Sequence, residues 1–370
     1  MNELRQNGQL TRSQVGERIR VAFPTVLRVV DSLIAKRWVR EIGLGESNGG
    51  RRPQVLEIEP AGAYAIGVEL GRRGIRMVGV DLMSNIVESE AISLRRMSSV
   101  DDFLENLSRF LDRCPVGRDR CLGIGVSVPG PLDPSIGRVP EVIEMPACWH
   151  QAEIVQQITD AFDLPTELGN DADAAALGEY WCGPRYNASP LLFVLIDVGI
   201  GAGLIHHGAL YSGARNAFGE ISHMVIRMPD SLENIRVEHT LNMVSLPGVY
   251  GGIPARLDHR RSEIQADRER WNHGDQEAGF NGFVPRVLDT LAVGLSNLAH
   301  VLDPAILVLG GERFLALPDG YHQIRQRYRE LHPCRGEEIV VAHFGEQAVA
   351  VGAAALVLQQ VFDATLLTPG

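Results

Sequence analysis

The sequence predicts an α/β protein in which a small basic head of helices and a hairpin precedes a larger two-lobed body. Three observations support this fold class. The residues up to Arg52 carry ten basic and five acidic side chains, whereas the rest of the chain carries 25 basic and 41 acidic. The same N-terminal stretch holds two helical patterns and a hairpin pattern. Beyond it, apolar strands that end in an acidic residue or a glycine recur in two sets, which indicates two similar halves.

Composition limits the class of protein. The 370 residues correspond to two or three domains at about 150 residues each. No apolar run approaches the roughly 18 residues of a membrane helix, and the N-terminus lacks a signal-peptide core, so we expect a cytoplasmic protein with no membrane partner. No CxxC spacing occurs, which argues against a disulfide framework or a cysteine zinc site. The five cysteines are Cys114, Cys121, Cys148, Cys182 and Cys334.

The head begins with two helix signals. Thr11 and Gln14 have the spacing of a capping box, which starts a first helix. Pro24 then stands in the first turn of a second helix, where proline is tolerated. Ala22 or Phe23 precedes it, although serine or threonine is the usual cap and its absence costs about 1 kcal/mol.

The second helix and the hairpin after it predict a DNA-binding surface. Apolar residues form one helical stripe: Val26, Val29, Val30, Leu33 and Ile34. Strands over 38–42 and 54–58 flank a connection rich in glycine and arginine, and helix, turn, helix and basic wing make a winged helix-turn-helix. We expect a double-stranded DNA operator to contact Thr25, Arg28, Ser32, Arg51 and Arg52. A helical hairpin that binds protein is the alternative.

The body repeats one pattern. Strands over 64–70 and 191–196 each end in an acid, any residue and a glycine, and those over 122–128 and 305–309 end in glycine turns. Two α/β lobes with ligands at the carboxyl ends of these strands follow. We place a head over 1–60, a first lobe over 61–168, a second lobe over 169–346 and a C-terminal helix over 347–370 that packs back on the first lobe. Helical periodicity covers 100–111, 153–162, 172–181, 284–302 and 347–362, whereas 256–275 is charged and aperiodic and is expected to be a solvated connection or helix.

Two stretches of the second lobe suggest a binding site. Asp197 to Gly203 follows a buried strand, and its alternating glycines would let backbone N–H groups approach an anion, although a plain tight turn is the alternative. Gly219 to His223 brings an acidic acceptor and an imidazole close together. Such a pair can hold neighbouring hydroxyl groups of a ligand.

The motifs together resemble the ROK family of repressors and sugar kinases over nearly the whole chain. This resemblance implies a two-lobed actin/hexokinase-like, ATPase-type fold behind the winged helix-turn-helix. The stretches that carry it are Gly49–Pro53, Val128–Pro131, Gly169–Glu179, Asp197–Gly203, Gly219–His223 and Asp303–Gly311.

The resemblance also implies site residues. Gly130, Asn170 and Asp171 would bind the sugar, and in a kinase Asp171 would be the general base. Glu220 and His223 would hold adjacent ring hydroxyls. Glu238 is the best match to a third glutamate of the family. A helix cap is the alternative role for Asp171, and a structural histidine the alternative for His223.

Three departures from the family pattern matter. Ser222 replaces a glycine, so the local backbone can differ. The family's zinc cysteines have no counterpart between Ile226 and Leu241, so we expect no zinc and no metal site. The longer acid Glu69, with Arg72 and Arg73, replaces small residues of a phosphate loop. We therefore interpret the nucleotide loops as vestigial: Glu69, Gly71, Arg72, Asp197, Gly199, Gly201, Gly310 and Gly311.

The sequence thus predicts a sugar-responsive, DNA-binding transcriptional regulator, with repression as the expected direction, on a degenerate sugar-kinase body. Its effector would be a sugar or a sugar phosphate, and it would form a homodimer or homotetramer on a palindromic operator. No cofactor is required. The alternative is a sugar kinase that carries a DNA-binding head, for which alone Mg-ATP would be a cofactor. A scaffold that binds neither ligand would leave the charge split unexplained.

Overall fold

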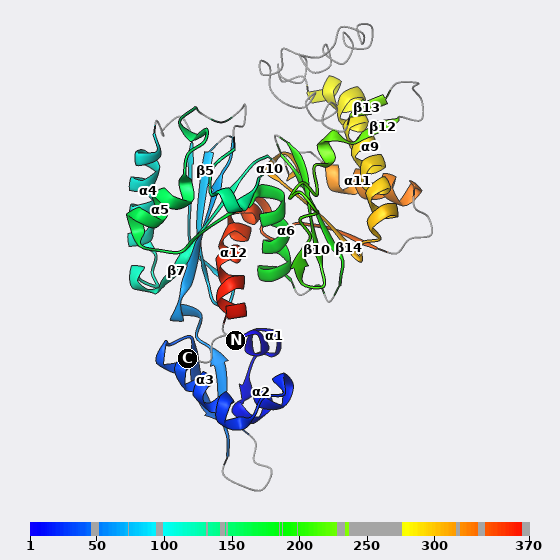
Figure 1. Cartoon of the computed structure of the whole chain (residues 1–370). Coiled ribbons are helices and arrows are strands. Elements are labelled where there is room, and N and C mark those ends of the chain that lie inside the picture. The colour runs from blue at the N-terminus through cyan, green and yellow to red at the C-terminus, as the bar shows by residue number, and fades with distance from the viewer. Residues whose placement is uncertain are drawn as a thin grey trace.

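The computed structural model places a small head at one end of a larger two-lobed body (Figure 1). It describes residues 1–45, 52–72, 74–93, 99–130, 132–140, 145, 147–184, 186, 188–197, 199–227, 234–236, 276–315, 319–331 and 337–364. Three predicted site residues, Arg51, Arg73 and Glu238, lie outside this part, as does the predicted connection over 256–275.

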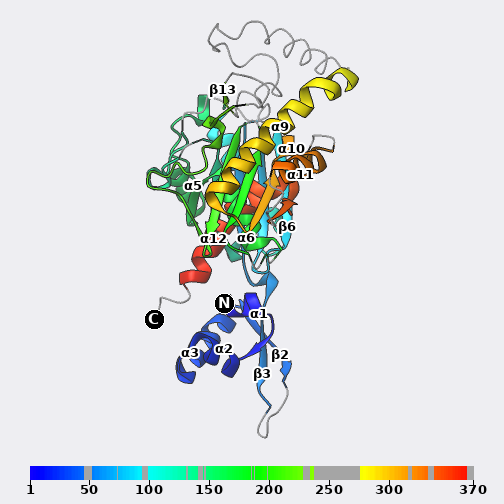
Figure 2. The ribbon, with the colours of Figure 1, turned by 90° about the vertical axis from the view of Figure 1, so that its right-hand side faces the viewer.

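The head consists of three helices and a three-stranded antiparallel sheet (Figure 2). Its helices are α1 (Asn2–Asn7), α2 (Arg12–Ile19) and α3 (Phe23–Ala35), and its strands are β1 (Leu10–Thr11), β2 (Val39–Leu44) and β3 (Gln54–Ile58). The strand order is β1-β3-β2. The two predicted helices and the predicted hairpin are confirmed, whereas α1 and β1 were not predicted.

Local sequence explains how these helices start. The Thr11 side chain accepts a hydrogen bond from the Gln14 backbone N–H, and Gln14 Oε1 accepts one from the Thr11 N–H at 2.8 Å, which is a complete capping box. Helix α3 begins after Ala22 without a side-chain cap, as predicted. Its buried residues are Val26, Val30 and Leu33, all on the predicted stripe.

The first lobe is a five-stranded sheet of order β6-β5-β4-β7-β8. Its strands are β4 (Tyr64–Leu70), β5 (Gly74–Asp81), β6 (Ile86–Ser93), β7 (Cys121–Val128) and β8 (Thr166–Asn170). Tyr64, Ile66 and Val68 point to one face, where they pack on α4 (Val100–Arg113) and α5 (Ile154–Phe162). The opposite face packs on α12 (Ala348–Ala364). Strand alternation thus gives this sheet two apolar faces, each covered by helices.

The second lobe is a five-stranded sheet of order β11-β10-β9-β14-β15. Its strands are β9 (Leu191–Ile196), β10 (Ile200–His206), β11 (Ala209–Leu210), β14 (Ile306–Gly310) and β15 (Glu338–Val341). One face packs on α9 (Gln276–Leu302) and α11 (Gly320–Leu331), and the other on α6 (Asp171–Cys182). Helix α9 begins eight residues before the predicted 284, and α11 was not predicted.

The two sheets repeat the same topology, which confirms the predicted internal repeat. In each, a central strand pairs antiparallel with the next strand of the hairpin and parallel with a later strand, as β4 does with β5 and β7, and β9 with β10 and β14. Residues at the carboxyl ends of β4, β7 and β9 line one cavity between the lobes: Glu69, Ser127 and Leu195. Structural symmetry therefore directs the predicted loops of both halves to one place.

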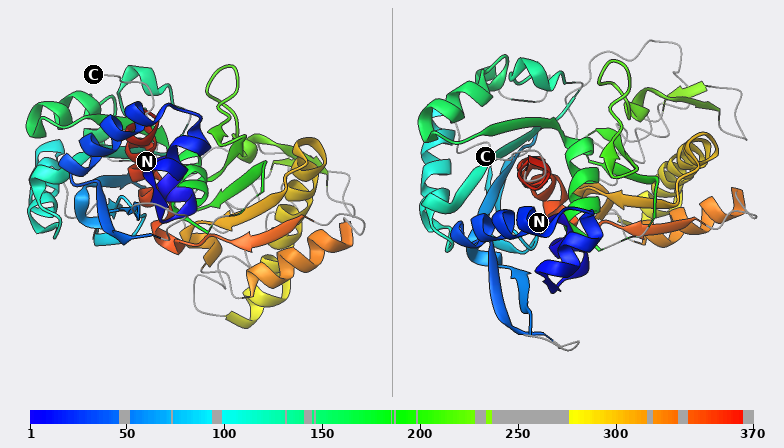
Figure 3. Two further views of the ribbon diagram at one scale, coloured as in Figure 1. Left: turned by 90° about the horizontal axis from the view of Figure 1, so that it is seen from below. Right: turned by 60° about the horizontal axis from the view of Figure 1, so that its bottom comes forward.

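Helices α6 and α12 lie side by side between the two sheets (Figure 3). Small residues allow this close crossing: a Cβ on Gly352 of α12 would lie 1.7 Å from the Ala174 backbone oxygen of α6. Likewise, a Cβ on Gly67 of β4 would lie 1.9 Å from the Ala350 backbone oxygen of α12. Glycine and alanine are required here because the two backbones almost touch.

The remaining described elements are short. They include α10 (Glu312–Leu315), the paired strands β12 (Val225–Arg227) and β13 (Asn234–Arg236), and 3₁₀ turns. Within the part of the chain that the structure describes, no helix has the length and apolarity to cross a membrane.

Candidate functional site

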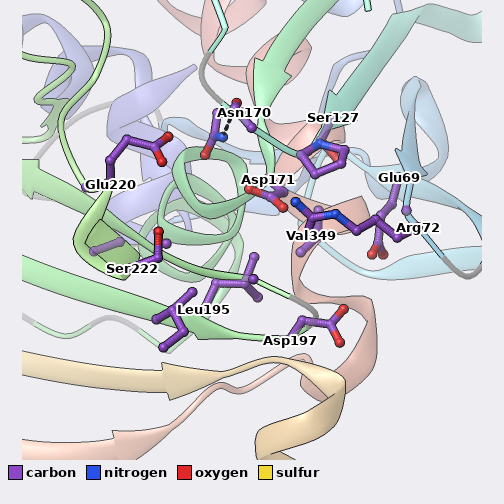
Figure 4. Close-up of a pocket in the computed structure, with 18 of the residues that line it drawn as sticks. Glu69, Arg72, Ser127, Asn170, Asp171, Leu195, Asp197, Glu220, Ser222 and Val349 are labelled. Carbon is purple, nitrogen blue, oxygen red and sulfur yellow. Dashed lines mark hydrogen bonds between the residues drawn. The ribbon is translucent and has the colours of Figure 1, made fainter. Parts of the chain in front are cut away.

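An open cavity lies between the two lobes. Both lobes line it with polar side chains that point inward (Figure 4). Ten of the predicted residues are among its lining: Glu69, Gly71, Arg72, Gly130, Asn170, Asp171, Asp197, Gly199, Gly201 and Glu220. Gly310, Gly311 and His223 are not among the lining residues.

Asn170 and Asp171 stand at the junction of β8 and α6. Asn170 is the N-cap: its Oδ1 accepts from the Ala172 and Asp173 backbone N–H groups at 2.9 and 3.2 Å. Its Nδ2 donates to the Gly130 carbonyl at 2.9 Å, which ties the β7 loop to the helix start. The cap role considered for Asp171 thus belongs to Asn170. Asp171 instead accepts from Ala172 N–H through Oδ1 at 2.8 Å and faces Arg72 across the cavity (Figure 4).

Carboxyl groups dominate the electrostatics of the site. Burial raises the pKa of Asp171 to about 6, against the opposing charge of Arg72. Burial, with repulsion from Asp171 and Glu220, raises the pKa of Asp173 to about 7. Burial also raises the pKa of Glu69 to about 8, although Arg76 opposes this shift. Burial likewise raises the pKa of Glu220. So many acceptors around one cavity suit a ligand rich in hydroxyl donors.

The glycine-rich stretch of the second lobe is only partly a turn, and the contact of its later glycines, Gly201 and Gly203, with an anion stays a prediction. The turn is short, with Asp197 N–H donating to the Gly199 carbonyl at 2.9 Å, and both later glycines lie within β10. A Cβ on Gly203 would lie 2.6 Å from the Ala172 backbone oxygen of α6, and one on Gly201 would lie 2.8 Å from the Ala172 Cβ. Both glycines therefore allow β10 to pack closely on α6, and Gly201 also lines the cavity.

Close packing also explains why glycine stands at the other predicted nucleotide-loop positions. Gly311 has φ +107° and a Cβ there would lie 2.3 Å from the Ile196 backbone oxygen, while Gly310 packs against the Phe193 ring. On the first lobe, Gly71 donates through its N–H to the Gly74 carbonyl at 2.9 Å and closes the β4–β5 turn. Glu69 at the end of β4 lies 3.5 Å from Arg76 Nη1.

The Gly219–His223 stretch brings two side chains into the cavity lining. Gly219 has φ +84°, and a Cβ there would lie 1.7 Å from the Ala202 backbone oxygen, so this position accepts only glycine. Glu220 and Ser222 line the cavity, whereas His223 is exposed at the end of a 3₁₀ turn. Ser222, which sequence reasoning treated only as a departure, adds a hydroxyl that can donate and accept. Ser127 and Phe218, which were not singled out, also line the cavity.

The predicted DNA-contacting face is exposed. Thr25, Arg28 and Ser32 lie on the solvent side of α3, and Arg52 is exposed two residues before the strand β3. Phe23 and Leu27 on the same helix are 52% and 41% exposed. This face combines a guanidinium, hydroxyls and apolar groups, which are the side-chain types that read base edges in a major groove.

Residues 65–360 match the model of the ROK family. The chain belongs to this family. The chain shares its fold with a ROK family transcriptional regulator, a homologue of the Escherichia coli MLC protein, at a TM-score of 0.71 and 22% identity over 99% of this chain and 96% of that one. A ROK hexokinase from Thermus thermophilus matches at a TM-score of 0.62 and 23% identity, covering 81% of this chain and 99% of the other.

Sequence relatives include the xylose repressor of Caldicellulosiruptor bescii, which is 24% identical over 378 residues, or 96% of this chain and 94% of the relative. The DNA-binding transcriptional dual regulator NagC of Escherichia coli is 27% identical over 324 residues, or 83% of this chain and 78% of that protein. The resemblance inferred from the motifs is therefore confirmed. The actin/hexokinase-like body is shared by kinases and regulators of the family, so the fold alone does not decide between them.

Proposed function

We propose that this ROK protein is a sugar-responsive transcriptional regulator, and a repressor, whose head binds an operator and whose cavity binds the effector. The observation that carries this proposal is the exposed polar face of α3 beside the hairpin, on a head that is basic while the body is acidic. Such a charge split steers the head, not the body, to DNA. The full-length likeness to a xylose repressor supports the same reading.

The cavity supports a sugar as the effector. Asp171 and Glu220 are charged acceptors, and Ser222 and Ser127 add hydroxyls. A hydrogen bond from a sugar hydroxyl to a buried carboxylate contributes about 1.5–3 kcal/mol. Asn170 then positions the helix start and the Gly130 loop. Glu238 and His223 stay proposed sugar contacts. We further propose that the protein acts in the cytoplasm as a homodimer or homotetramer and needs neither zinc nor another cofactor.

The DNA-binding part is tested by selecting duplexes from a random library and titrating the best one at several salt concentrations. Arg28→Ala should relax sequence preference, because an arginine on the open face of α3 can pair with a guanine edge. The double change Arg51→Ala with Arg52→Ala should weaken binding to all sequences and reduce the salt slope by about 1–2. Arg109→Ala, on the exposed face of α4, is the matched control. Binding without sequence preference in the wild type would reject the regulator proposal.

A sugar kinase that carries a DNA-binding head is the second candidate, because Asp171 stands where a general base would take a hydroxyl proton. The Arg72 side chain in the cavity argues against it, since Mg-ATP phosphates need open space beside the glycine turns. A coupled ADP-release assay with each sugar that raises the melting temperature decides the question. Sugar-dependent turnover that Asp171→Ala abolishes would establish the kinase.

A further inference from the structure

Arg72 joins the two lobes across the cavity. It belongs to the turn between β4 and β5 of the first lobe, yet its guanidinium lies against Gly199 in the second lobe. A Cβ on Gly199 would lie 3.1 Å from Arg72 Nη1 and 3.7 Å from Nη2. Figure 4 shows the side chain extending inward, with its guanidinium directed at Asp171. The missing Cβ of Gly199 leaves the room that the guanidinium fills.

More acidic than basic side chains surround Arg72 in the cavity. Four carboxyl groups line the cavity, Glu69, Asp171, Asp197 and Glu220, and Arg72 is the one lysine or arginine among the described lining residues. Other nearby arginines are held at the edge of the site. Arg76 lies 3.5 Å from Glu69 and 3.3 Å from Glu346, and Arg313 lies 4.0 Å from Asp197.

We propose that Arg72 is the positioning residue of the effector site: it bridges the lobes and presents its positive charge to Asp171 and Glu220, the acceptors for the hydroxyls of an unphosphorylated sugar. This inference rests on the proposed sugar-binding function. Because the lining acids outnumber this cation, a phosphate group on the sugar would meet net repulsion. A neutral polyol meets none and finds its acceptors already ionised and oriented.

The pH dependence of binding reports this role. The Arg72 charge opposes the effect of burial on the pKa values of Asp171 and Glu220. Other groups act on the same carboxyls: Asp197 and Glu220 repel Asp171, His223 attracts Glu220, and Asp171 and Glu220 raise the pKa of Asp173. Glu69 is the remaining carboxyl group of the cavity, and the charges of Arg76, Asp197 and Glu312 act on it. Without the Arg72 charge, the pKa values of Asp171 and Glu220 would rise, and both would take up protons nearer neutral pH.

The experiment compares full-length wild type with Arg72→Met, Arg72→Lys and the surface control Arg109→Met. The probes are D-xylose, D-glucose and N-acetylglucosamine with their phosphate esters, titrated by calorimetry from pH 5 to 8. In the wild type, affinity should fall as the pH drops through about 6, where Asp171 becomes protonated. Arg72→Met should weaken the binding of the best free sugar at pH 7 by roughly tenfold or more and begin its loss of affinity at a higher pH. Arg72→Lys should restore the pH profile, because the charge is kept.

The outcomes separate the two claims. If no probe sugar binds the wild type, the proposed function itself fails. If the wild type binds sugar and Arg72→Met keeps its affinity and pH profile, the inference is wrong while the proposed function stands. The same holds if Arg72→Lys shifts the profile as far as Arg72→Met does, or if a phosphate ester binds more tightly than its free sugar. A melting curve like that of Arg109→Met shows that each variant is folded.

Discussion

At the scale of single residues, Asp171 couples the site to pH. Burial raises its pKa from near 4 to about 6. At a pH between these two pKa values, Asp171 holds more protons on average in the folded chain than in the unfolded chain. The free energy of unfolding therefore falls as the pH rises, and this cost of ionising Asp171 is complete above its folded pKa. The site is thus less stable when empty at neutral pH, as is common where acceptors are arranged for a ligand.

Asp171→Asn removes that cost. We expect the ligand-free variant to be more stable than the wild type at pH 7.5, on the order of 1 kcal/mol, and equally stable near pH 4. Scanning calorimetry at the two pH values measures this, and Asp160→Asn on the exposed face of α5 is the control. Sugar binding should be lost while operator binding persists. A variant that is destabilised at pH 7.5, or that still responds to sugar, would contradict the assigned role.

Single residues also show where sequence reasoning succeeds. Thr11 and Gln14 predicted a capping box because that signal is local, with both partners three positions apart. The packing role of Gly201 and Gly203 was not predicted, since a glycine that admits a phosphate and one that admits a neighbouring helix look the same in sequence. The partner that decides, Ala172 of α6, is distant along the chain. Ser222 was likewise undervalued, because only the fold turns it toward the cavity.

At the scale of elements, strands β4, β7, β9 and β14 were predictable, because each is a buried apolar run that ends at glycine or an acid. Helix α11 was not, since its polar sequence buries only Gly320, Ile324 and Tyr328. Strand β15 is four residues long and half exposed, so its pattern carries little signal. The α6–α12 crossing, which determines how the lobes meet, depends on small residues whose partners the sequence does not reveal.

Gly352 tests that crossing. Gly352→Ala would put a Cβ 1.7 Å from the Ala174 backbone oxygen, and since neither helix backbone can move freely, α6 and α12 must separate. We expect a loss of ~2 kcal/mol or more in the free energy of unfolding, because an extra methyl group in a packed core forces backbone shifts. Denaturant titration measures it, with Gln360→Ala on the exposed side of α12 as the control. Equal stability of Gly352→Ala and wild type would refute the close crossing.

At the scale of the whole molecule, α6 connects the cavity to the head. It begins beside Asn170 and Asp171 and ends near Trp181, which the head contacts through α1. Arg5 Nη1 donates to the Trp181 carbonyl at 2.5 Å, and the guanidinium lies 3.5 Å from the centre of the Trp181 ring. Trp181 in turn packs edge-on against Phe362 of α12, with ring centroids 5.0 Å apart. The ends of both inter-lobe helices therefore form the surface on which the head rests.

Arg5→Met should loosen this attachment. A partly buried cation–π contact and a charge-assisted hydrogen bond together contribute about 2–4 kcal/mol, so amide exchange in α1 should become faster while exchange in the body sheets stays unchanged. Asn2→Ala, which removes only an exposed 3.5 Å hydrogen bond to Asp363, is the matched control. The effector can act on the head through α6. In that case Arg5→Met should also reduce the ratio of operator affinities measured with and without sugar, because the coupling cannot exceed the free-energy difference between the head positions with and without sugar. Unchanged protection of α1 would show that the head is held elsewhere. Faster exchange with an undiminished sugar response would show that the signal does not pass through this contact.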